Sequence, residues 1–189
     1  MSTAPLAPTR RVMLANFAVF QLSWFAAVLG AAHDVALWGT LCIAAAIGWH
    51  VAVSARPAKE VSLIGAALLI GLVFETLVVA MGNVRYPTGQ ALHWLAPYWL
   101  VSLWGAFAIT LNVTLRWLRG RPWLAGVLGA VAGPASFAAG VRLGAASFVN
   151  TAAALLTLAI GWALLMPLLM RLAVRFDGVC LPHARSQHG

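Results

Sequence analysis

One acidic residue, Glu75, lies inside an apolar stretch long enough to cross a membrane in this chain of 189 residues. An unpaired carboxylate at membrane depth costs about 2.5–3.5 kcal/mol on insertion scales, so Glu75 should be protonated, paired or facing water in a cavity. A rise of 1.5 Å per residue places it roughly 21 Å from the cytoplasmic start of its helix, in the outer half of the bilayer. Such a carboxyl group can serve as an acid or base, as a proton carrier, or as half of a structural ion pair.

Arg142 and His93 lie at the same predicted outer level, at the end and the beginning of their own apolar stretches. We therefore expect an outer cluster in which Glu75 pairs with Arg142 or His93. Glu75 and Arg142 are the candidate catalytic residues, with Arg142 binding an anionic group or tuning the carboxyl. The alternative is a pair that holds the fold together and does no chemistry, because one carboxylate and one cation do not specify a reaction.

A second group of polar residues lies toward the predicted cytoplasmic boundary or deeper within the spans. Amide and imidazole groups in such places commonly join helices by hydrogen bonds worth about 1 kcal/mol each. Three or four of them at one depth would instead form a polar pocket open to the inner leaflet. The vertical separation from Glu75, about 15 Å, suggests two ends of one elongated cavity that a lipid would fit. The candidate binding residues are Asn16, Gln21, His50, His93, Asn112, Arg116 and Ser136.

The elements that must position these residues are six apolar stretches, at residues 12–32, 35–55, 61–81, 93–115, 123–141 and 147–170. The chain is 62% hydrophobic and only 8% charged, whereas a soluble domain carries about 25% charged residues. The sequence therefore predicts an all-α integral membrane bundle of six transmembrane helices. We expect a cytoplasmic N-terminal segment at 1–11, the transmembrane domain at 12–170, and a basic cytoplasmic tail at 171–189.

The positive charge is distributed asymmetrically. Of the 12 Lys and Arg residues, all except Arg85 and Arg142 fall on one side of the predicted bundle. Short loops rich in Lys and Arg stay in the cytoplasm, so both termini should be cytoplasmic. The net charge of +8 is then a topology signal, and no nucleic-acid partner is expected because no basic run is interleaved with aromatic residues outside the spans.

The first apolar stretch also imitates a cleavable signal peptide, with Arg10 and Arg11 before it and small residues at 30–32. Its apolar run exceeds the usual signal core of about 7–15 residues. Asn16 and Gln21 within it suit a packed helix, so a retained span is favoured.

Small residues in the fifth stretch predict close helix packing. Gly129 and Gly133 form a small-xxx-small pair that lets helix backbones approach closely, and Pro134 removes a backbone donor nearby. Whether this face also joins a second copy of the chain is open. The nine tryptophans favour anchoring and packing over ligand stacking. Cys42 and Cys180 predict neither a disulfide nor a metal site, and no cofactor motif is present.

Three motifs carry a resemblance to a known family. They are Asn16-Phe17-x-x-Phe20-Gln21-x-x-Trp24-Phe25, Trp104-x-x-Phe107-Ala108-x-Thr110-Leu111-Asn112 and Gly133-Pro134-x-Ser136-x-x-x-Gly140-x-Arg142-Leu143-Gly144-Ala145. Together they resemble a small bacterial inner-membrane family catalogued as a domain of unknown function, over roughly residues 11–170. The resemblance implies a bacterial inner-membrane location and genes near cyclopropane-fatty-acid-synthase-like methyltransferases and flavin-dependent amine-oxidase-like proteins. It transfers no catalytic residue.

The sequence and the resemblance together favour an enzyme or accessory factor that handles a lipid-phase substrate in acyl-lipid modification. The expected partners are membrane lipids, with a lipid-modifying enzyme or a second copy of the chain as further candidates. One alternative is a structural or assembly subunit of a membrane complex. Another is a small proton-coupled transporter that uses Glu75.

Overall fold

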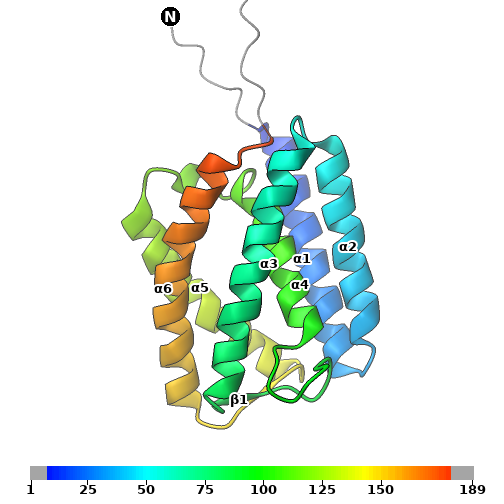
Figure 1. The fold of residues 1–189 in the computed structure, drawn as a ribbon, viewed down its shortest axis with the longest axis vertical. Helices are drawn as coiled ribbons and strands as arrows, with labels where there is room; N and C mark the ends of the chain where they lie inside the picture. Colours follow the sequence, from blue (N-terminus) through cyan, green and yellow to red (C-terminus); the bar gives the residue numbers. More distant parts are fainter. Residues whose placement is uncertain (1–7, 180–189) are drawn as a thin grey trace, which may run out of the picture.

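The computed structural model describes residues 8–179, and within them the chain forms six α-helices (Figure 1). All of these helices except α4 are long and apolar enough to cross a membrane. The all-α membrane bundle predicted from the composition is confirmed. The helices are α1 (Arg10–Ala32), α2 (Ala36–Val53), α3 (Pro57–Ala80), α4 (Tyr98–Leu111), α5 (Pro122–Arg142) and α6 (Thr151–Arg175).

The outer surface of the bundle is apolar on every long helix. Leu22 on α1 is 71% exposed and Trp123 on α5 is 78% exposed. Soluble proteins rarely expose contiguous apolar surface of this extent, so these side chains face lipid rather than water. The protein is therefore a multi-pass membrane protein.

The fourth helix is shorter than predicted and lies inside the bundle. The predicted span at 93–115 is wrong in its limits, because α4 has 14 residues and begins only after Pro97. At 1.5 Å per residue it is about 21 Å long, less than the roughly 30 Å of the hydrocarbon layer. It packs on α1, α2 and α3 and buries residues such as Trp104 and Ala108.

Two short strands close the end of the bundle opposite the start of α1 (Figure 1). Strand β1 (Val84–Arg85) follows α3 and pairs antiparallel with β2 (Ser147–Phe148), which follows α5. The pairing joins the loop after α3 to the loop after α5. Tyr86, the next residue after β1, is buried against Trp99, with ring centroids 6.1 Å apart.

At the other end, the 3₁₀ helix η1 (Arg116–Leu118) connects α4 to α5. Helix α6 continues past Met170 to Arg175, and the chain then folds back over the N-terminal end of α3. Cys180 and Arg185 lie outside the described residues.

The small residues of α5 pack against α6, as their spacing predicts. A Cβ atom on Gly129 would lie 2.4 Å from the Trp162 carbonyl oxygen, and one on Gly133 would lie 2.4 Å from the Trp162 ring. This close approach is therefore made within the chain, and it fixes Trp162 beside α5.

Candidate functional site

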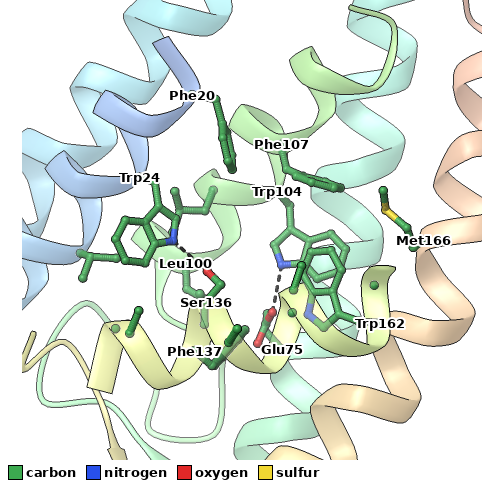
Figure 2. Close-up of a pocket in the computed structure, with 18 of the residues that line it drawn as sticks. Phe20, Trp24, Glu75, Leu100, Trp104, Phe107, Ser136, Phe137, Trp162 and Met166 are labelled. Carbon is green, nitrogen blue, oxygen red and sulfur yellow. Dashed lines mark hydrogen bonds between the residues drawn. The ribbon is translucent and has the colours of Figure 1, made fainter. Parts of the chain in front are cut away.

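A partly open cavity of about 700 Å³ lies between α1, α4, α5 and α6, and we call it the Glu75 cavity. Its wall is overwhelmingly apolar and aromatic (Figure 2). Gln21, Glu75, Tyr86 and Ser136 contribute polar side chains. Its size falls within the range of about 300–1,000 Å³ typical of small-molecule sites.

Glu75 is fully buried on the inward face of α3, one turn beyond Gly71. Its Oε1 accepts a hydrogen bond from Trp104 Nε1 at 3.0 Å, drawn as a dashed line in Figure 2. Its Oε2 is buried without a hydrogen-bond partner among the described residues. A buried carboxyl group with one satisfied oxygen is unusual, because native proteins pair nearly all buried polar atoms.

Trp104 and Trp162 form an aromatic stack beside this carboxyl. Their ring centroids are 4.8 Å apart and the rings are nearly parallel, at 18°. Phe107 meets the Trp162 ring edge-on at 5.4 Å. A Cβ on Gly71 would lie 2.2 Å from the Trp104 ring, so Gly71 provides the space that the stack occupies on the α3 side.

The far wall of the cavity is made by α1 and α5. Trp24 Nε1 on α1 donates to Ser136 Oγ on α5 at 3.0 Å, and Figure 2 shows this bond on the opposite side of the cavity from Trp162. Phe20 and Phe137 complete that side. Within residues 8–179, the Trp24–Ser136 bond is the one hydrogen bond between side chains of these two helices.

A second buried carboxyl, Glu60, lies in the first turn of α3, and we call its surroundings the Glu60 cluster. His50 Nε2 lies 2.8 Å from Glu60 Oε2, while Asn112 Nδ2 and the Gly178 backbone N–H donate to Oε1, each at 2.7 Å. Gly178 is held in turn because its carbonyl accepts from the Arg56 N–H at 2.8 Å. Both oxygens of Glu60 are therefore satisfied, although the side chain is fully buried.

Two arginines from the α4–α5 connection extend the Glu60 cluster toward the surface. Arg116 and Arg119 each place Nη1 2.8 Å from Asp177 Oδ2, and Arg119 also donates to Asn112. Partial burial acts to raise the pKa of the Asp177 carboxyl. The hydrogen bonds and positive charges of Arg119 and Arg116 outweigh it and lower the pKa below its ordinary value.

The predicted outer cluster is not formed. Glu75 points inward to Trp104, whereas Arg142 is the exposed last residue of α5 and makes no ion pair within residues 8–179. His93 lies exposed in the loop before α4, because Pro97 delays that helix. Equal depth in the membrane does not bring residues together when their helix faces differ.

The predicted binding residues separate into distinct places. His50, Asn112 and Arg116 meet in the Glu60 cluster, where they are bound to one another and to Glu60 by hydrogen bonds. Asn16 lies apart from them, donating to the Ile109 carbonyl at 3.0 Å and accepting from Thr114 Oγ1 at 2.7 Å. Helix joining is thus the role that the contacts of these residues show.

Gln21 and Ser136 line the Glu75 cavity instead. The residues that sequence reasoning missed are Glu60, Trp104, Trp162 and Tyr86. Glu60 was assigned to a loop, yet Pro57 at the first helical position followed by an acidic residue in the first turn is typical of a helix start. Trp104 begins one of the motifs that carry the family resemblance, but nothing in the sequence indicated the cavity for Tyr86, Trp104 or Trp162.

One family model matches the chain, over residues 13–168, and it is described as a protein of unknown function, DUF2878. The chain belongs to this family. Neither the curated proteins nor the solved structures contain a match to it. In this DUF2878 protein the Glu75 cavity lies wholly within the matched range, whereas Asp177 and Gly178 of the Glu60 cluster lie beyond it.

Proposed function

We propose that the protein binds an apolar, lipid-phase molecule in the Glu75 cavity, as an accessory factor or enzyme of acyl-lipid modification in a bacterial inner membrane. The observation that supports this most directly is an aromatic cavity inside a membrane bundle that contains one buried carboxyl group with an unpaired oxygen. A molecule dissolved in the bilayer could reach such a site without passing through water.

The chemistry of the wall supports binding more strongly than catalysis. Among the described residues that line the cavity, Glu75 is the one carboxyl group, and no Lys, Arg, His or Cys accompanies it. Acid–base catalysis ordinarily needs a second group that positions or exchanges the proton. A single carboxyl beside stacked indoles is well suited to recognising one polar group on an otherwise apolar ligand.

The orientation follows from the basic residues. Arg116, Arg119, Arg121 and Arg175 lie at the end of the bundle that holds the Glu60 cluster. We place that end in the cytoplasm because short basic connections remain on that side. Glu75 then lies in the outer half of the membrane, and the cavity extends from Tyr86 at the outer end to Leu118 at the cytoplasmic end.

Two alternatives are less well supported. In a structural subunit, the glycines of α5 would form the partner surface, but Gly129 and Gly133 are already occupied by α6. In a proton-coupled transporter, a polar path would connect Glu75 with the Glu60 cluster. Between them α3 buries Leu63, Ile64 and Ala67, which are apolar.

The test is mass-spectrometric profiling of membrane lipids from cells that lack the gene, complemented with wild type, Glu75→Gln or Glu75→Leu. Leu77→Ala, on the lipid-facing side of the same helix at 58% exposure, is the matched control. We expect an acyl-lipid species to change in the null strain, and wild type and Leu77→Ala to restore it.

The two Glu75 variants separate the roles. A binding role predicts that Glu75→Gln restores the lipid profile and Glu75→Leu does not, because the amide retains hydrogen-bonding capacity. Failure of both variants, each present at wild-type level, would identify proton transfer by Glu75. An unchanged lipid profile in the null strain, under normal growth and oxidative stress alike, would refute the proposal.

A further inference from the structure

Three buried polar atoms in the wall of the Glu75 cavity have no hydrogen-bond partner among the described residues. They are Glu75 Oε2, Trp162 Nε1 and Tyr86 Oη. In Figure 2 the nitrogen-bearing edge of the Trp162 ring faces the side on which the Glu75 carboxyl lies. Native proteins pair nearly all buried polar atoms, so three unpaired atoms in one cavity wall need an explanation, and a bound ligand with matching donors and acceptors is one.

The charge of Glu75 decides which kind of partner it can take. The carboxyl is fully buried, and no cationic side chain lines the cavity within residues 8–179. An isolated carboxylate without a counter-charge is strongly disfavoured in an apolar environment, so the group is the neutral acid. Its Oε1 accepts from Trp104 at 3.0 Å, which assigns the carboxyl hydrogen to Oε2.

The other two unpaired atoms are donors as well. An indole N–H donates and cannot accept. The phenol of Tyr86 keeps its proton, because burial raises its pKa well above the ordinary value. The cavity therefore presents three O–H or N–H donors and, apart from the phenol oxygen, no free acceptor among these atoms.

We propose that these three donors recognise a neutral carbonyl oxygen on an apolar chain, such as the ester carbonyl of an acyl lipid. This inference rests on the proposed function and adds the class of ligand. A protonated amine would need acceptors that the three groups do not offer. A carboxylate or phosphate would bring a charge into the same apolar site that keeps Glu75 neutral.

The experiment titrates the purified full-length protein in detergent micelles, by native mass spectrometry, with methyl palmitate, hexadecylamine and hexadecane. These probes share one chain and differ in the polar end. We expect methyl palmitate to bind most tightly. Each hydrogen bond that hexadecane cannot make should weaken its binding by at most about tenfold. The amine should bind no more tightly than the alkane.

Substitutions then assign the preference to the three donors. Trp162→Phe and Tyr86→Phe each remove a donor and keep the ring, so each should weaken methyl palmitate binding several-fold and leave hexadecane unchanged. Glu75→Gln should retain binding, because its amide can accept from Trp104 and donate to the ligand. Glu75→Leu should lose the preference for the ester. Trp49→Phe, on the lipid-facing side of α2 at 48% exposure, is the matched control.

The outcomes separate the two proposals. If no probe binds, the proposed function fails. If all three bind equally, the cavity takes apolar molecules but the donor assignment is wrong. Tighter binding of the amine, abolished in Glu75→Gln, would show that Glu75 is a charged acceptor and would overturn the inference.

Discussion

Glu60 and Glu75 both lie on the buried side of α3, about 22 Å apart along the helix axis. Glu60 has both oxygens satisfied, by His50, Asn112 and the Gly178 N–H. Glu75 has one oxygen satisfied, by Trp104, and borders a cavity of about 700 Å³. Burial alone therefore does not distinguish a structural carboxyl from a binding one, whereas the count of satisfied oxygens does.

The largest expected difference between the two carboxyl groups is in the unfolding free energy that each variant loses. We expect Glu60→Ala to cost about 3–5 kcal/mol, since it leaves the Asn112 and Gly178 donors buried and unpaired. Glu75→Leu should cost less, about 1–3 kcal/mol, because it leaves a single buried donor, Trp104 Nε1, unpaired. Equilibrium unfolding of both variants in mixed micelles measures the difference. Equal losses would contradict the assignment of separate roles.

The next effect concerns the backbone that closes the Glu60 cluster. A Cβ on Gly178 would lie 2.5 Å from the Arg56 carbonyl oxygen and 2.7 Å from Glu60 Cγ. We expect Gly178→Ala to lose about 1–3 kcal/mol of unfolding free energy, as overpacking does. Gly65→Ala on α3 is the control, because nothing lies within 4 Å of a Cβ there. A neutral Gly178→Ala would mean that this segment can move away freely.

Trp104→Phe tests the one hydrogen bond that Glu75 makes in the cavity wall. It keeps the ring against Trp162 but removes the hydrogen bond to Glu75, and should cost about 1–2 kcal/mol. Combining it with Glu75→Leu should recover most of that loss, because both polar partners are then gone. Thermal unfolding of the single and double variants forms the cycle, and strict additivity would argue against a functional Trp104–Glu75 bond.

The smallest effect is a pH dependence. The pKa of Asp177 is lowered in the folded protein, so its contribution is fully present above the unfolded value of about 3.9 and is lost as the pH falls through the folded pKa. Asp177→Asn should therefore lose this contribution at neutral pH and flatten the acid limb of the stability profile, with little change in stability below the folded pKa. Asp34→Asn, in an exposed turn, is the control. An unchanged acid limb in Asp177→Asn would exclude this linkage.

Features that depend on the local sequence were predictable, whereas features that depend on neighbours in the fold were not. The long helices follow from apolar length, which is a property of composition, and the limits predicted for α1, α2, α3, α5 and α6 agree with the structure within a few residues. The face on which Glu75 lies depends on neighbours, so its pairing with Arg142 was wrong and Trp104 was missed. The burial of Glu60 was not predicted for a different reason. A charged residue near the end of a span is expected to face water unless its buried partners are known.

The bond between Gly178 and Glu60 also has a consequence for biosynthesis. Its partners are 118 residues apart, and a ribosome adds about 5–20 residues per second, so Glu60 waits about 6–24 s for its backbone donor to be made. During that time α3 is already complete, while α4, α5 and α6 are still being inserted. The end of the bundle that holds the Glu60 cluster can therefore close only after α6 and Gly178 have been made.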